Sequence, residues 1–246
     1  MIEKVIQEIR AYLKNNPPHL TDEQKSRMYK ILNSDNPNFT AYGNKHSDIE
    51  KFIRELNNKF QLNYNKASEI FKMLIKTNVH DEKITGVFLL NRFKKDFNKE
   101  TVEMIQKFIP NNFDTWAITD TTMIRVIGPF LGKKGNEELA KKTLATWSIS
   151  DNLWVRRASL VILLKLVMIN KEFDEDYVFR FAEKMLKYPE DYIHKGIGWL
   201  LKTCSKYNPD SIYNYLIDNK ERLPRLILRY GCEKLPKEKR AQILKK

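Results

Sequence analysis

The stretch Arg157-Ala158-Ser159-Leu160-Val161-Ile162 places a polar residue before a small one, and a mainly apolar run follows. The same order recurs in Thr85–Leu90 and in Lys195–Leu200. The small residues stand at positions 86, 158 and 196, at intervals of 72 and 38 residues. These intervals are about two units and one unit of a helical-pair repeat of roughly 40 residues. We interpret each apolar run as the buried inner helix of one pair, whose small residue lets a neighbouring helix approach closely.

Apolar residues recur at helical spacing through the rest of the chain, and almost no segment alternates with a period of two. Start signals stand at Thr21, Asn98 and Asn208, and Gly128-Pro129 is typical of a helix end. The expected helices are 2–15, 22–33, 47–60, 65–78, 81–95, 99–109, 113–127, 136–148, 152–170, 174–187, 190–206, 209–219 and 222–235.

These patterns predict an all-α fold, a HEAT-like or armadillo-type superhelix of about six helical pairs that forms one domain over residues 1–246. The 246 residues are 42% hydrophobic, which is enough apolar material for one sizeable core. Only 8 Gly and 9 Pro are present, too few turn formers for a β-sandwich or barrel. An ordinary helical globule without a true repeat is the alternative.

The charge balance favours a polyanionic partner. Lys and Arg total 44 against 31 Asp and Glu, which gives a formal charge of +13. Nucleic acid is the first candidate, although ribosome-associated and lysine-rich housekeeping proteins share this composition. Residues 220–246 hold ten Lys and Arg against three Glu, so this segment contributes +7. A solvated helix that aids solubility is the alternative interpretation of this segment.

Several classes of protein are not indicated. Cys204 and Cys232 have no neighbouring Cys or His, so neither a disulfide framework nor a thiolate metal site is expected. The four histidines form no metal-binding or catalytic-triad pattern, and we expect no cofactor. The first residues lack a secretory signal, and the longest apolar stretch, 158–169, is interrupted by Lys165. We therefore expect a soluble, cytoplasmic protein, associated with the nucleoid if it is bacterial.

The tryptophans carry the most functional information. Trp116, Arg157 and Trp199 are separated by 41 and 42 residues, so in a solenoid of this period they would project from equivalent places onto one concave surface. A lone Trp is more often packing, and we assign Trp147 to the core. Asp120 follows Trp116 by four residues, which places an indole and a carboxylate on one helix face.

A carboxylate is an unusual element of a groove that binds DNA passively, because it repels phosphate. Asp120 could cap a neighbouring helix instead. It could also stabilise the oxocarbenium ion that forms when an N-glycosidic bond breaks, and orient the attacking water. Indole faces add cation–π attraction to a cationic base or sugar, and a positively charged alkylated purine is already a good leaving group.

Three segments resemble the DNA alkylation repair family of AlkD-type glycosylases. They are Trp116–Asp120, Ser150–Ala158 and Lys195–Lys202, and the later Asn208–Asp210 and Leu223–Tyr230 also look like that family. The resemblance covers most of the chain and is strongest over residues 110–235. It implies a HEAT-like solenoid whose concave face holds duplex DNA, in a monofunctional, monomeric glycosylase that removes N3- and N7-alkylated purines without extruding the base.

The resemblance also implies the roles of individual residues. Asp120 would be the catalytic carboxylate, Trp116 and Trp199 would contact the deoxyribose of the lesion, and Arg157 would hold the DNA backbone. No metal and no lyase lysine would be needed. Further expected DNA contacts near this site are Arg156, Trp154, Lys195 and Lys202. Lys45 and His46 are expected contacts from the N-terminal loop, where Ser47 replaces the family's usual proline and residues 33–44 look like an insertion.

Two other functions compete with the glycosylase. A non-catalytic HEAT-like module that binds damaged or branched nucleic acid would explain the charge and the repeat, and it would make no demand on Asp120. A protein-binding scaffold is the third possibility, and it predicts DNA affinity that is absent or insensitive to salt.

Overall fold

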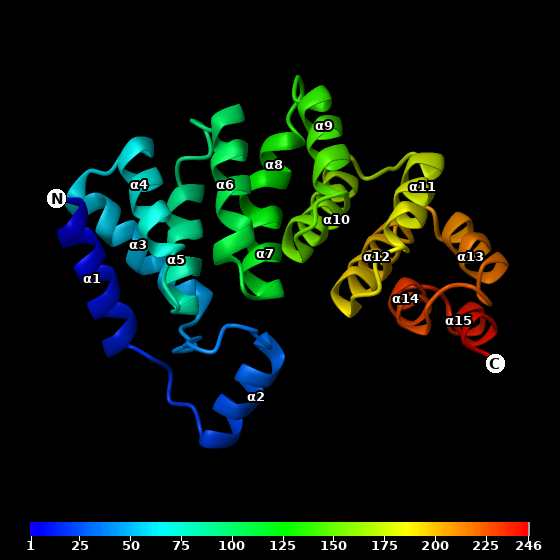
Figure 1. The fold of residues 1–246 in the computed structure, drawn as a ribbon, viewed down its shortest axis with the longest axis horizontal. Helices are drawn as coiled ribbons and strands as arrows, with labels where there is room; N and C mark the ends of the chain where they lie inside the picture. The colour runs from blue at the N-terminus through cyan, green and yellow to red at the C-terminus, as the bar shows by residue number, and fades with distance from the viewer. Residues whose placement is uncertain (246) are drawn as a thin grey trace. The chain divides into compact units, whose positions relative to one another are not determined.

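The computed structural model describes residues 1–245, which form fifteen α-helices and one π-helix (Figure 1). Within these residues the only β-type pairing is an isolated bridge between Thr40 and Val79. The predicted all-α class is therefore confirmed. The chain divides into two compact units, Met1–Val126 and Ile127–Lys246. Lys246, one of the ten C-terminal cations, lies outside the described residues.

Helix α5 is the centre of the first unit. Its residues from His80 to Leu90 are all buried, and it packs against α1, α3, α4 and α7. Burial on every side includes the charged residues Asp81, Glu82 and Lys83 in its first half, which explains why the helix lacks an amphipathic pattern. The helices of this unit are α1 (Ile2–Asn15), α2 (Asp22–Leu32), α3 (His46–Phe60), α4 (Tyr64–Leu74), α5 (His80–Asn91), α6 (Lys99–Asn112) and α7 (Trp116–Thr122).

Helices α10 and α12 hold the second unit together. Helix α10 packs against α8, α9 and α12, and α12 packs in turn against α11, α13 and α14. The helices of this unit are α8 (Gly128–Leu131), α9 (Glu137–Trp147), α10 (Leu153–Asn170), α11 (Glu175–Met185), α12 (Asp191–Cys204), α13 (Pro209–Asp218), α14 (Arg225–Gly231) and α15 (Lys237–Leu244).

The small residues of the inner helices lie at close helix contacts. A Cβ atom at Gly86 of α5 would lie 3.3 Å from Leu74 Cβ on α4, and one at Gly196 of α12 would lie 2.9 Å from Leu160 Cδ1 on α10. The predicted role is confirmed for these two glycines. Gly198 permits a second close contact on α12, because a Cβ there would lie 2.5 Å from Tyr230 Cβ on α14. Trp147 is 1% exposed and belongs to the core, as expected.

The predicted helix starts are confirmed by their caps. Thr21 Oγ1 accepts a hydrogen bond from Gln24 N at 3.2 Å, and Thr21 N donates to Gln24 Oε1 at 2.9 Å, which completes a capping box. Asn98 caps α6 in the same way with Thr101. The Asn208 side chain accepts from Ser211 N at the start of α13, where Pro209 is the first helical residue.

The expected single helix over 113–127 is wrong. Helix α7 begins at Trp116, and after Thr122 the chain continues as a π-helix, Met123–Ile127, and then directly as α8. Gly128-Pro129 therefore does not end the helical path. In a regular α-helix the Pro129 ring would crowd the carbonyl of Arg125, and the wider π-helical turn before it is one way for a helix to accommodate a proline. Helix α15 was not among the expected elements.

A buried ion pair joins α5 to the segment that precedes α7. Lys83 Nζ lies 2.8 Å from Asp114 Oδ2 and donates to Asn112 O at 2.6 Å. The side chains of Lys83 and Asp114 are 3% and 9% exposed. Asn36 Nδ2, from the segment after α2, donates to the same oxygen of Asp114 at 3.3 Å. Three parts of the unit therefore meet at one carboxylate.

Asp114→Asn is expected to lower the free energy of unfolding by about 3 kcal/mol, because it leaves the Lys83 ammonium buried without its counterion. Urea unfolding followed by circular dichroism measures this change. Glu138→Gln is the control, since it removes an exposed pair with Lys141 at 3.1 Å and should cost less than about 0.5 kcal/mol. Equally small losses for both variants would show that Lys83 does not depend on Asp114.

Candidate functional site

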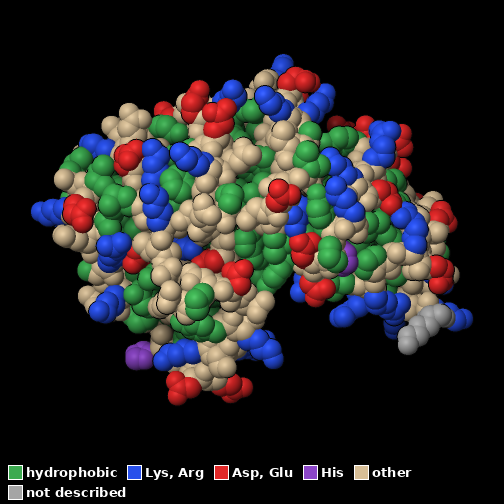
Figure 2. Space-filling view, viewed as in Figure 1, with side chains coloured by type: hydrophobic (Ala, Val, Ile, Leu, Met, Phe, Trp, Pro, Cys, Tyr) green, Lys and Arg blue, Asp and Glu red, His purple; other side chains and the backbone are tan. Residues whose placement is uncertain are grey.

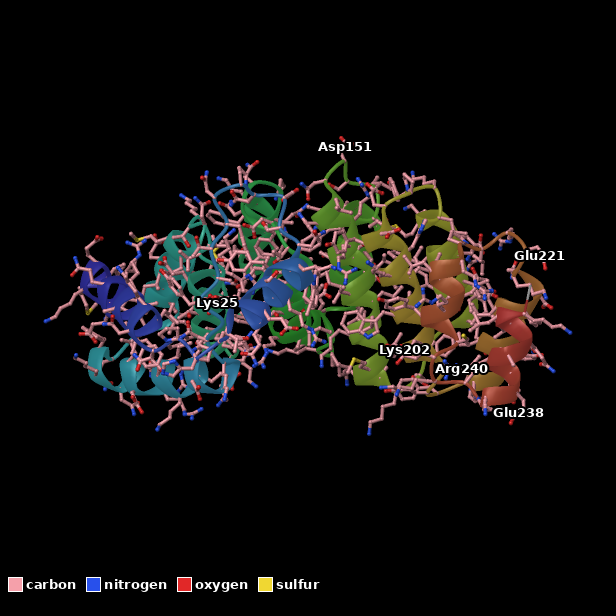
Figure 3. The ribbon with its side chains drawn as sticks, turned by 90° about the horizontal axis from the view of Figure 1, so that it is seen from below. Lys25, Asp151, Lys202, Glu221, Glu238 and Arg240 are labelled. Atoms are coloured by element: carbon pink, nitrogen blue, oxygen red, sulfur yellow. The ribbon has the colours of Figure 1, made fainter. Side chains whose placement is uncertain are left out.

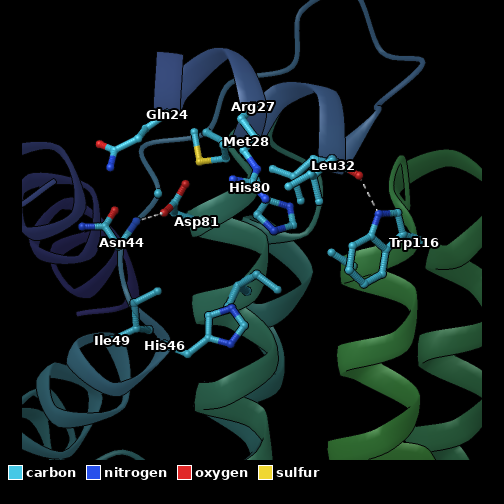
Figure 4. Close-up of a pocket in the computed structure, with 15 residues that line it drawn as sticks. Gln24, Arg27, Met28, Leu32, Asn44, His46, Ile49, His80, Asp81 and Trp116 are labelled. Carbon is cyan, nitrogen blue, oxygen red and sulfur yellow. Dashed lines mark hydrogen bonds between the residues drawn. The ribbon is translucent and has the colours of Figure 1, made fainter. Parts of the chain in front are cut away.

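Helix α7 carries the first half of the predicted site. Thr115 caps this helix through Oγ1, which accepts from Ile118 N at 3.3 Å, so Trp116 is the first helical residue. The indole of Trp116 is partly exposed, and its Nε1 donates to Ile31 O of α2 at 2.8 Å (Figure 4). Helix α2 therefore orients the ring.

Asp120 lies one turn after Trp116 and is only 6% exposed. The neighbouring hydroxyls are occupied, because Thr119 Oγ1 donates to Thr115 O and Thr122 Oγ1 donates to Ile118 O. The π-helix begins three residues later, and the amide of Met123 is directed to the carbonyls of Thr119 and Asp120. Single π-helical turns inside α-helices are frequent at functional sites.

The second half of the predicted site lies on α10 and α12. Arg157 is 5% exposed, and its Nη1 donates to Tyr192 O at 2.6 Å, so α12 holds the guanidinium in place. Trp199 lies two turns further along α12 and is partly exposed. Trp116 and Asp120 belong to the first unit and Arg157 and Trp199 to the second, so their predicted meeting on one surface stays a prediction.

Arg156 and Trp154, two of the expected DNA contacts, both have partners within the second unit. The guanidinium of Arg156 donates to Ser150 O at 2.7 Å, pairs with Glu190 and lies 4.3 Å from the centre of the Tyr188 ring. Trp154 is 6% exposed and packs against Tyr192 with the ring centres 5.1 Å apart. Both side chains are engaged inside the second unit, and we leave them out of the DNA contacts proposed below.

Lys195 and Lys202 project from α12. Lys195 Nζ lies 5.3 Å from the centre of the Tyr192 ring and is partly exposed. Lys202 Nζ lies 2.8 Å from Glu233 Oε2, and this hydrogen bond lowers the pKa of Glu233 (Figure 3). Lys195 is therefore the more available of the two for a phosphate.

Much of the C-terminal charge is already paired within the second unit. Arg222 donates to both carboxylate oxygens of Glu183, at 2.7 and 2.5 Å, and Lys239 pairs with Asp210. Arg225 Nη2 donates to Leu244 O at 2.6 Å. Figure 2 shows Lys and Arg side chains interspersed with Asp and Glu on the visible face. The formal charge of a segment thus overstates the field that it offers to DNA.

A basic depression on the first unit was missed by sequence reasoning. It has a volume of about 330 Å³ and is lined by residues of α3, α5, the turn after α5 and the π-helix, among them Arg54, Arg92, Lys94 and Arg125. Arg125 pairs with Glu50 and stacks 4.4 Å from the centre of the Phe88 ring. Arg54 and Arg125 come from segments far from Arg92 and Lys94 in the sequence, so the basic run 92–95 alone does not reveal the cluster.

The expected N-terminal contacts lie beside this depression. Lys45 is exposed and is the N-cap residue of α3. The ring of His46 meets the edge of Phe88 with the centres 5.0 Å apart. Desolvation of the imidazole lowers the pKa of His46, and the nearby Arg125 guanidinium lowers it further. His46 is therefore a neutral polar group near neutral pH, whereas Lys45 is a cation.

A second cavity, of about 420 Å³, lies between α2, α5 and α7 (Figure 4). Its wall includes Trp116, Asn44, His80 and Asp81. His80 is 8% exposed, and burial lowers its pKa to about 4 although the carboxylates of Asp81 and Asp114 act in the opposite direction. The imidazole of His80 is therefore neutral at physiological pH.

The depressed pKa of His80 predicts a loss of stability in acid. The unfolded chain binds a proton at His80 below about pH 6.5, whereas the folded protein does not until about pH 4, so the stabilisation is lost as the pH falls between these values. Between pH 7.5 and pH 5, wild type should lose about 2 kcal/mol more unfolding free energy than His80→Asn. Urea titrations at both pH values measure this difference. His19→Asn, at an exposed histidine, should retain the wild-type pH dependence; identical profiles for all three proteins would contradict the prediction.

Within the described residues, no group of three or more His, Cys, Asp or Glu side chains is arranged to hold a metal ion. Both cysteines are buried there, and desolvation raises the pKa of each thiol. No helix of the described chain has the length and apolar character needed to span a membrane.

Comparisons with known proteins agree with this architecture. The sequence model of a protein family that is described as "DNA alkylation repair enzyme" matches residues 6–235. A solved structure described as a predicted DNA alkylation repair enzyme from Enterococcus faecalis is similar, with a TM-score of 0.70 and 20% identity over 88% of this chain and 97% of that chain. A search of curated proteins found no match. The structural likeness confirms the all-α superhelical fold class, while the count of six HEAT-like pairs stays a prediction.

Proposed function

The chain belongs to the DNA alkylation repair enzyme family, and from this premise we propose that it is a monofunctional DNA glycosylase. Its substrate would be duplex DNA that contains cationic N3- or N7-alkylated purines, and its reaction the hydrolysis of the N-glycosidic bond. The observation that carries the proposal is the buried carboxylate of Asp120 one helical turn from the partly exposed indole of Trp116.

Burial makes Asp120 suited to this reaction. Departure of the purine builds positive charge on the deoxyribose, and a fixed carboxylate stabilises that charge more strongly in a desolvated site than in water. The same carboxylate can orient the water that attacks C1′. Because the purine is already cationic, it leaves without a proton from the enzyme, and neither a metal nor a lyase lysine enters the proposed reaction.

Indole and cationic side chains complete the proposed site. Trp116 and Trp199 would contact the deoxyribose, where each indole face contributes about 0.5–2 kcal/mol of cation–π attraction. Arg157 and Lys195 would contact phosphates from the second unit. Lys45, His46 and the basic depression would do so from the first. In this proposed function the two units form one HEAT-like domain, and the protein acts as a monomer in the cytoplasm.

Asp120→Asn is expected to slow single-turnover release of 7-methylguanine from methylated duplex DNA by at least about tenfold, a loss of about 1.4 kcal/mol of transition-state stabilisation. The amide keeps the shape of the side chain but removes the charge that opposes the oxocarbenium ion. Asp151→Asn is the matched control, because Asp151 is exposed in the loop before α10 and should retain the wild-type rate.

The outcomes separate the competing functions. An unchanged rate for Asp120→Asn, with unchanged circular dichroism, would remove this carboxylate from the mechanism. If wild type binds DNA but releases no alkylated base, the protein is instead a non-catalytic module for damaged or branched nucleic acid. Absent or salt-independent DNA binding would favour a protein-binding scaffold.

The basic depression of the first unit predicts a specific salt dependence. The double variant Arg54→Ala, Arg92→Ala removes two exposed cations, so the slope of log affinity against log salt should fall in magnitude by about 0.9 for each phosphate that the protein no longer neutralises. Fluorescence anisotropy on duplex DNA across a salt series measures this slope. The control is Lys141→Ala, Lys142→Ala on the exposed face of α9, which also removes two charges. Equal slopes for the two variants would place the depression outside the DNA interface.

A further inference from the structure

The cavity between α2, α5 and α7 adjoins the proposed reaction site, because Trp116 belongs to the walls of both. Most of its wall is apolar, with Met28 and Leu32 from α2, Ile49 from α3 and Ile84 from α5 (Figure 4). The indole of Trp116 closes one side, and its ring is fixed by the hydrogen bond to Ile31 O. The volume of about 420 Å³ is in the range of small-molecule sites, which combine apolar walls with a few placed polar groups.

Two of its polar atoms have no hydrogen-bond partner. These atoms are His80 Nδ1 and Asn44 Oδ1, and each belongs to a residue that is only 8% exposed. Buried polar atoms are nearly always hydrogen-bonded in native proteins, so an unpaired one in a cavity wall indicates a missing partner. The Asp81 carboxylate, by contrast, has partners: it accepts from Tyr42 N at 2.7 Å and from Asn44 N at 2.8 Å.

We propose that this cavity binds a free purine base, the product that the proposed glycosylase releases; the inference rests on that function. The flat indole of Trp116 provides a surface on which a heteroaromatic ring can stack. Asn44 Oδ1 can accept from an exocyclic amine or ring N–H of the base. His80 Nδ1 can either donate to or accept from a ring nitrogen, since a neutral imidazole offers one nitrogen of each kind.

The released alkylpurine is electrically neutral, which suits the mostly apolar wall of the cavity. When the C1′–N bond breaks, its electron pair remains on the departing alkylpurine, and the cationic ring becomes neutral. Water adds to C1′ and releases one proton to solvent, so charge and atoms balance. A neutral base can enter a mostly apolar cavity without losing strong hydration, whereas a nucleotide would have to desolvate its phosphate in a wall that holds the buried carboxylate of Asp81 and a single arginine, Arg27.

Isothermal titration calorimetry of the full chain with 7-methylguanine and with AMP tests the proposal. We expect binding of the base and at least tenfold weaker binding of AMP. His80→Phe keeps a ring of similar shape but removes the hydrogen bond, and it should weaken base binding by roughly tenfold. The matched control, His19→Phe, makes the same chemical change at an exposed residue outside the cavity and should bind the base as wild type does.

A second measurement does not depend on the folding of a variant. In wild-type protein labelled with ¹⁵N-histidine, 7-methylguanine should shift the imidazole resonances of His80 and leave those of His19 unchanged. A base that binds without moving the His80 signal, or AMP that binds as tightly as the base, would overturn the assignment of the cavity.

Asp120→Asn separates this inference from the proposed function, because it should lose excision while it retains base binding. Excision by wild type without any binding of the free base would overturn the product site alone. Binding of the base at His80 by a wild-type protein that excises nothing would overturn the glycosylase and leave a purine-binding site. Loss of base binding in Asp120→Asn would show that the base binds at the catalytic carboxylate and not in this cavity.

Discussion

The buried ion pair between Lys83 and Asp114 is the contact on which the candidate site of the first unit depends. Asp114 precedes Trp116 by two residues, so the pair fixes the start of α7 against the central helix α5. Asn36 binds the same carboxylate, and it belongs to the segment that leaves α2. The Trp116 indole and the Asp120 carboxylate therefore take their positions from an interaction that neither of them makes.

Several charged side chains of this protein are buried, so the net charge of +13 alone does not show which cations its surface presents to DNA. Lys83 and Arg156 are among the most buried polar residues, and each donates to a main-chain carbonyl. These two side chains hold neighbouring segments together inside the protein. Cations that can reach DNA more readily lie on exposed side chains, such as Arg54 and Arg92 in the basic depression. A polyanion would thus meet local clusters rather than a uniform field.

The inner helices could be predicted from the sequence because close helix packing requires a short local pattern, a small residue followed by an apolar run. An inner helix needs a small residue where its neighbour approaches closely, and Gly86 and Gly196 mark those places. The π-helix over 123–127 could not be predicted in this way, because it depends on how the chain accommodates Pro129 without ending the helix. The burial of Trp154 and Arg156 could not be predicted for a related reason. Residue type and spacing do not distinguish a side chain that faces its own neighbours from one that faces DNA.

The candidate site also limits the chemistry that the protein can perform. A carboxylate and indole faces stabilise positive charge, but they do not donate a proton to a departing base. Each indole contributes about 0.5–2 kcal/mol of cation–π attraction, and about 1.36 kcal/mol changes the rate by a factor of ten. This contribution is small beside the activation barrier for the loss of a neutral purine. Such a site is effective only where the leaving group is already cationic. Selectivity for alkylated purines would then arise from the instability of their glycosidic bonds, with no need for a pocket that recognises the alkyl group, and the same site would leave undamaged DNA intact.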